Sequence, residues 1–160
     1  MSVKLIDADQ LCDLVESSSS SLLLVDSRPF TSFNSAHVDG AVNVHCPAIV
    51  RRRAGGRIPI ANVVRSSEAL ADLTAGRCRV VVVYDESSSS VDQLDAESNA
   101  RLSLSSLADV LAPSTHLYLL KGIIIISSVS ITYSKPVPIY MFSFFRLCFS
   151  LLHCILNERL

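Results

Sequence analysis

Hydrophobic and polar positions in the first three quarters of the chain alternate between two patterns. A short continuous apolar run at 22–25 is typical of a strand buried on both faces, and strands are also expected at 40–44, 79–84 and 117–120. Apolar residues at helical spacing predict helices after Asp7, at 28–35, at 68–74 and at 94–111. This alternation predicts an α/β domain with a mostly parallel central sheet and helices on both faces.

Particular side chains are expected to face the core of this domain. Phe30 and Phe33 are expected to point inward from their short helix. The helix at 94–111 has one apolar face, made of Leu104, Leu107, Val110 and Leu111. The serine runs at 17–21 and 87–90 are expected to link elements.

The last quarter of the chain has a different pattern. Residues 139–156 form an 18-residue apolar stretch, interrupted by Arg146 and His153. Its length is at the lower bound for a membrane span, but an arginine at the centre costs about 2.5–3.5 kcal/mol. We therefore expect an amphipathic helix or a poorly ordered tail, not a membrane span. The chain divides into a domain at 1–122 and a divergent apolar tail at 123–160.

Composition narrows the function classes. The 160 residues are 49% hydrophobic and 18% charged, with a net charge of -1, which excludes a charge-rich disordered chain. Without the three basic residues and one acidic residue of 123–160, the domain holds 11 basic and 14 acidic residues. The five cysteines form no CxxC pair and no zinc-binding spacing, and the N-terminus has no apolar signal. We expect an intracellular protein with free thiols, no metal and no cofactor.

Two segments resemble the rhodanese homology domain. The strand at 22–25 leads into Asp26-Ser27-Arg28, and a short helix separates this from His37-Val38-Asp39-Gly40-Ala41-Val42-Asn43. The resemblance covers most of residues 4–122 and implies a rhodanese-like α/β fold. Its structural motif would consist of Asp26, Arg28, His37 and Gly40.

The loop after the strand at 79–84 argues against catalysis. Rhodaneses and related cell-cycle phosphatases carry their cysteine at the start of this loop, and the resemblance places Asp85 there, followed by Glu86. A carboxylate forms neither a persulfide nor a phosphocysteine, and two acids repel an anionic substrate. The domain is expected to be catalytically silent.

The segment Ile49-Val50-Arg51-Arg52-Arg53-Ala54-Gly55-Gly56-Arg57-Ile58-Pro59-Ile60 resembles the kinase-interaction motif of dual-specificity MAP kinase phosphatases. In that family a noncatalytic rhodanese-like domain precedes the phosphatase domain. The resemblance implies a monomeric module that binds MAP kinases, is nuclear rather than cytoplasmic, and is truncated before the phosphatase domain. The tail would then come from intron read-through or an alternative terminal exon. The implied docking residues are Arg51, Arg52, Arg53, Arg57, Ile58 and Ile60.

The charge pattern also predicts a docking segment, independently of the resemblance. Residues 51–65 contain five arginines and no acid, which favours encounter with an acidic partner and bidentate pairing with carboxylates. Ile58 and Ile60, in an extended chain, point to one side and are expected to fill a partner's apolar pocket. A solvated arginine patch is the alternative. Nucleic acid is not expected, because this segment has no aromatic residues to stack on bases.

A different class of function, an enzyme, is the competing hypothesis. It would be a single-domain sulfurtransferase, or a phosphatase that uses Cys46, because His45-Cys46 with Arg52 satisfies the pattern His-Cys-x5-Arg. Against this, Ile49 stands where the phosphatase family has glycine, Arg53 stands where Ser or Thr is usual, and Pro47 has no N–H to offer a phosphate.

Overall fold

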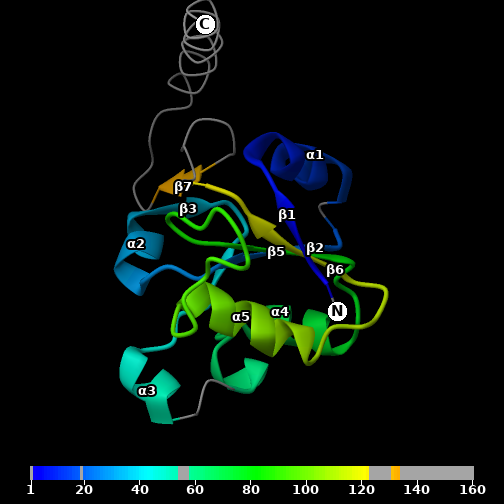
Figure 1. Cartoon of the computed structure of the whole chain (residues 1–160). Coiled ribbons are helices and arrows are strands. Elements are labelled where there is room, and N and C mark those ends of the chain that lie inside the picture. Colours follow the sequence, from blue (N-terminus) through cyan, green and yellow to red (C-terminus); the bar gives the residue numbers. More distant parts are fainter. Residues whose placement is uncertain (1, 19, 54–57, 123–130, 134–160) are drawn as a thin grey trace, which may run out of the picture.

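A parallel sheet forms the centre of the computed structural model, which describes residues 2–18, 20–53, 58–122 and 131–133 (Figure 1). The sheet has five strands in the order β1-β6-β5-β2-β4, and every neighbouring pair is parallel. These strands are β1 (Val3–Ile6), β2 (Leu22–Asp26), β4 (Val42–Asn43), β5 (Val80–Tyr84) and β6 (His116–Leu120). The prediction of an α/β domain with a mostly parallel sheet is confirmed.

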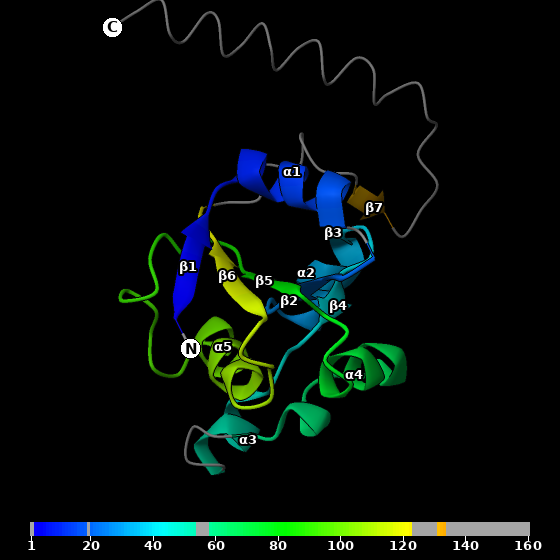
Figure 2. The same cartoon turned by 90° about the vertical axis from the view of Figure 1, so that its right-hand side faces the viewer.

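Helices cover both faces of the sheet (Figure 2). Helix α1 (Ala8–Ser18) lies on one face, and α4 (Ser67–Thr74) and α5 (Asn99–Ala108) lie on the other. The short helices α3 (Ala48–Arg53) and η1 (Ile60–Asn62) lie on the same side as α4 and α5. Between β2 and the small strand β3 (Ala36–Val38) the chain forms α2 (Phe30–Ser35).

The domain has two hydrophobic cores, one on each face of the sheet, and the central strand β5 contributes to both. Its five residues are all buried. Val81 and Val83 belong to the apolar cluster that includes residues of α4 and α5. Val82 and Tyr84 belong to the second cluster, which includes Leu11 of α1. Since successive side chains of a strand point to opposite faces, a continuous run of valines supplies both cores.

Several elements differ from the sequence-based expectation. The pattern did not predict β1, β3, α3 or η1, which have between three and six residues each. The helix expected at 94–111 is shorter and begins at Asn99, because the Ser98 side chain accepts the Arg101 N–H and caps it. It ends at Ala108, so Val110 lies beyond the buried face and is 39% exposed.

The expectation that Phe30 points into the core is wrong. Phe30 is 53% exposed, and α2 buries none of its residues. Phe33 is half-buried and stacks on the ring of His37, with centroids 3.9 Å apart. Besides this stack, the Ser32 hydroxyl of α2 donates to the carboxylate of Glu86 at 3.0 Å.

One short piece of the tail pairs with the domain. Strand β7 (Ile131–Tyr133) is antiparallel to β3, with Ala36 opposite Tyr133 and Val38 opposite Ile131. The apolar stretch at 139–156 lies outside the described residues. Among the helices that are described, none has the length and apolar character needed to cross a bilayer.

Candidate functional site

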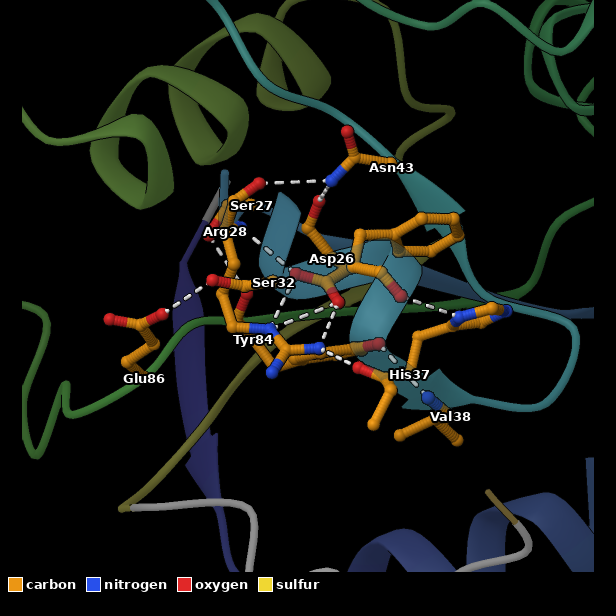
Figure 3. Close-up of polar contacts among 11 residues, drawn as sticks. Asp26, Ser27, Arg28, Ser32, His37, Val38, Asn43, Tyr84 and Glu86 are labelled. Carbon is orange, nitrogen blue, oxygen red and sulfur yellow. Dashed lines mark hydrogen bonds and ion pairs between the residues drawn. The ribbon is translucent and has the colours of Figure 1, made fainter. Parts of the chain in front are cut away.

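Asp26 and Arg28 form a buried ion pair at the carboxyl end of β2 (Figure 3). The Asp26 side chain is fully buried and accepts bonds from the Arg28 backbone N–H at 2.9 Å, from Nε at 3.0 Å and from Nη2 at 2.6 Å. The hydrogen bond to Asp26 raises the pKa of Arg28 despite partial burial. Nη2 also donates to the carbonyl of Ala36 at 2.7 Å, so the pair ties β2 to the start of β3.

Further contacts around this pair are also structural (Figure 3). The Asn43 amide donates to the carbonyls of Asp26 and Arg28, at 3.1 and 3.0 Å. The Tyr84 hydroxyl accepts the backbone N–H of Val38 at 3.2 Å, and burial raises its pKa strongly. These side chains lie at the carboxyl ends of β2, β4 and β5 and connect the three strands with β3.

His37 lies in β3, and Gly40 lies in the turn between β3 and β4. Nδ1 of His37 is 2.9 Å from the carbonyl of Phe33, which fixes the ring over α2. Gly40 has φ of +73°, in the left-handed region that favours glycine, at the turn where Ala41 N–H bonds to the carbonyl of Val38. Both residues therefore shape the backbone of this connection.

In the loop after β5, the carboxylate of Asp85 accepts hydrogen bonds from the residues that follow it. Asp85 accepts the backbone N–H groups of Ser87 and Ser88, at 3.0 and 2.8 Å, and also the Ser88 hydroxyl. The Ser88 carbonyl accepts the N–H of Gly122 at 2.9 Å. Two N–H groups that an anion-binding loop would offer to a ligand are thus bound to Asp85, whose negative charge repels an anion.

The basic segment folds into the six-residue helix α3, which is exposed along most of its surface. Ile49 and Val50 are 56% and 44% exposed, and Arg52 and Arg53 are exposed beside them. We call these four residues the arginine face. Arg51 is half-buried and turned toward α5, and Arg57 lies outside the described residues.

The expectation that Ile58 and Ile60 are free to fill a partner's pocket is wrong. Each is only 4% exposed, and both belong to the core cluster on the α4 and α5 side of the sheet. The carbonyl of Ile58 accepts the Ser106 hydroxyl of α5 at 2.7 Å. The two isoleucines are buried within the domain, and the exposed apolar residues of the segment are Ile49 and Val50.

Asn99, the first residue of α5, is the centre of a polar network under α3. Its Oδ1 accepts the backbone N–H of Cys46 at 3.1 Å and Nη1 of Arg51 at 2.6 Å. Its Nδ2 donates to Nδ1 of His45 at 2.7 Å. Arg51 Nη1 also donates to the carbonyl of Cys46 at 2.7 Å. The sequence analysis did not identify Asn99, and no local motif marks it.

The Cys46 hypothesis finds no support in this geometry. Cys46 is 4% exposed, and burial raises the pKa of its thiol although Arg51 partly opposes this. The following residues form α3, in which the N–H groups of Val50 and Arg51 bond to the carbonyl of Pro47. A buried thiol beside N–H groups that are already bonded provides neither a nucleophile nor a phosphate cradle.

Burial of His45 makes a pH-dependent contribution to stability. Burial, and then the charges of Arg51 and Arg65, lower the pKa of His45. The folded state disfavours protonation of His45. The contribution of His45 to stability is therefore fully present above its unfolded pKa of about 6.5 and decreases as the pH falls below that value. Urea unfolding at about pH 7.5 and about pH 5.5 should show a smaller loss in His45→Gln than in the wild type.

His116→Gln is the matched control, since His116 is exposed on β6. This variant should lose as much stability on acidification as the wild type. Equal losses in all three proteins would contradict the assignment to His45.

The parallel sheet with helices on both faces defines an α/β domain, in which Asp85 is the first residue after β5. Residues 7–122 match the family described as Rhodanese-like domain, and the chain belongs to this family. It is 36% identical over 122 residues to dual specificity protein phosphatase 1 of Mus musculus. The aligned residues cover 76% of this chain and 33% of that protein. It is 40% identical over 93 residues to dual specificity protein phosphatase 4 of Gallus gallus, covering 58% and 25%. The chain thus spans a third or less of these relatives.

Solved structures agree with the fold. A thiosulfate sulfurtransferase from Pseudomonas aeruginosa is similar with a TM-score of 0.51 and 15% identity, covering 85% of this chain and 20% of that one. The BH2092 protein from Bacillus halodurans has a TM-score of 0.50 and 12% identity, covering 82% and 77%. Likeness at these identities shows the fold alone. The chain is a rhodanese-like module related to dual-specificity protein phosphatases.

Proposed function

We propose that this chain is a noncatalytic docking module that binds MAP kinases through the arginine face. The observation that carries the proposal is that α3 exposes Arg52 and Arg53 beside two exposed apolar side chains, Ile49 and Val50. The relationship to dual-specificity protein phosphatases, and the likeness of residues 49–60 to their kinase-interaction motif, point to kinases as the partner.

Charge supports an acidic partner surface. The domain has a net negative charge, so a local group of arginines orients an approaching acidic protein and speeds encounter. Arg65 adds to the positive charge on this side, because it lies close enough to lower the pKa of His45. Ile49 and Val50 supply apolar area within the same face, where burial on binding is favourable.

Loss of two charges on the arginine face should weaken the complex. Arg52→Ala/Arg53→Ala is expected to lower the affinity for a purified MAP kinase at least about tenfold, about 1.4 kcal/mol. The wild-type affinity should also fall steeply between low and physiological salt, since exposed charges are screened. Titration calorimetry measures both effects, and circular dichroism should show an unchanged fold because exposed arginines contribute little to stability.

Arg77→Ala/Arg79→Ala is the charge-matched control. Both arginines are exposed and precede the amino end of β5, whereas α3 follows the carboxyl end of β4. Because β4 and β5 run parallel in one sheet, the two arginine pairs lie toward opposite ends of its strands. The control should bind as tightly as the wild type. Equal weakening by both double variants would indicate a nonspecific charge effect, and no weakening by either would rule out the arginine face.

A further inference from the structure

We propose that Asn99 is a positioning residue that sets the orientation of α3 and thereby of the arginine face. The inference rests on the proposed docking function and adds the device that prepares the docking surface. It is based on the contacts of a single side chain, which reaches from the first turn of α5 to the residues on either side of the start of α3.

The Asn99 amide uses both of its ends. Oδ1 accepts from the Cys46 backbone just before α3 and from Arg51 inside it, while Nδ2 donates to His45. A backbone N–H and a guanidinium can only donate. Rotation of the amide by half a turn would put Nδ2 against two donors, so this network admits one orientation. Nδ1 of His45 is then an acceptor, so the neutral His45 ring carries its proton on Nε2.

Helix α3 depends on this anchor more than a longer helix would. It has six residues and none of them is fully buried. A helix of this length is not stable by itself, because one or two turns do not offset the cost of nucleation. Arg51 is its one residue that is not exposed, and the guanidinium of Arg51 is held by Asn99 and by the carbonyl of Cys46.

The consequence for docking is a division of roles among the three consecutive arginines. Nη1 of Arg51 is bonded inside the domain and holds α3, so Arg51 offers less of its guanidinium to a partner's carboxylates than Arg52 and Arg53 do. Arg52 and Arg53 point outward on a helix whose direction Asn99 fixes. A surface held in its binding conformation loses less conformational entropy when the partner binds. Asn99 therefore strengthens docking without contact with the partner.

The test compares Asn99→Ala, which removes all three bonds, with Asn99→Asp, which keeps the acceptor toward Cys46 and Arg51. Asn62→Ala is the matched control, because Asn62 is exposed on η1. We expect faster hydrogen exchange of the Cys46 amide in Asn99→Ala than in the wild type, measured by NMR. Its affinity for a MAP kinase should fall about tenfold, while Asn99→Asp retains affinity within about threefold and Asn62→Ala changes neither quantity.

The nitrogen shifts of His45 give a signature that a general loss of stability would not produce. In the wild type the neutral ring should be the Nε2–H form, and in Asn99→Ala the Nδ1–H form should gain population. Unchanged Cys46 exchange and an unchanged His45 tautomer in Asn99→Ala would overturn the positioning role. Equal loss of affinity in Asn99→Ala and Asn99→Asp would also overturn it.

Failure of docking itself would be recognised separately. If the wild type does not bind the kinase, the docking function is overturned, together with the effect of Asn99 on it. The exchange and tautomer measurements need no kinase, so they still decide whether Asn99 holds α3.

Discussion

Asp26→Ala is expected to lower the free energy of unfolding by about 3–5 kcal/mol, because it leaves the Arg28 guanidinium without its carboxylate. The Asp26 side chain is fully buried, and the Arg28 side chain is 15% exposed. Removal also leaves the Arg28 backbone N–H without its acceptor. For a domain of this size such a loss is a large fraction of total stability. Urea unfolding followed by circular dichroism measures it.

The ion pair of Arg77 with Asp72 provides a control of equal length. Its N···O distance is 2.6 Å, as in the Arg28–Asp26 pair, but its side chains are 60% and 39% exposed. Asp72→Ala should therefore cost no more than about 1 kcal/mol, since solvent screens the pair. A similar cost for both substitutions would show that burial does not make the Asp26 pair important. Arg28→Ala should resemble Asp26→Ala, because it leaves a buried carboxylate unpaired.

The central sheet could be predicted because its strands have a continuous apolar pattern. Residues 80–84 are valines and a tyrosine, and a strand buried on both faces tolerates nothing else at most positions. The edge strand β1 was missed, since it has four residues and includes the exposed Lys4. Edge strands need less apolar area, so their pattern is weak. Helix α3 was missed because three consecutive arginines give no apolar periodicity.

Some residues of the candidate site could be predicted from the sequence, but the contacts between them could not. The exposed arginines could be identified from charge, and Asp85 from its place after a clear strand. The bonds from Asn99 to Cys46 and Arg51 join residues 53 and 48 positions apart, and nothing near Asn99 in the sequence indicates them. The inward direction of Arg51 was therefore not predictable. The same applies to Tyr84, whose hydroxyl meets Val38 across 46 positions.

The two isoleucines show how a local pattern leads to the wrong surface. Alternation around Pro59 is equally compatible with an exposed peptide and with a segment packed against a helix. The structure contains the second arrangement, in which Ile58 and Ile60 cover α5 while Pro59 is exposed. Apolar residues next to a basic cluster therefore do not identify the contact surface until the packing of the domain is known.

Ile60→Ala should thus act on stability and not on docking. Removal of a buried isoleucine side chain is expected to cost about 2–5 kcal/mol, from lost burial and from the cavity left behind. The fraction that stays folded should bind a MAP kinase with unchanged affinity. Urea unfolding gives the first quantity, and calorimetric titration at a temperature where the variant is folded gives the second.

Ile49→Ala makes the same chemical change on the arginine face, where Ile49 is 56% exposed. Its effect on stability should stay within about 0.5 kcal/mol, as for most surface substitutions. Its effect on kinase affinity should exceed that of Ile60→Ala, because only Ile49 has apolar area left for a partner to cover. The reverse result would be a stable Ile60→Ala that binds the kinase weakly and an Ile49→Ala that binds it normally. It would show that residues 58–60 provide the apolar contact with the partner. It would also mean that this segment leaves the core when the partner binds.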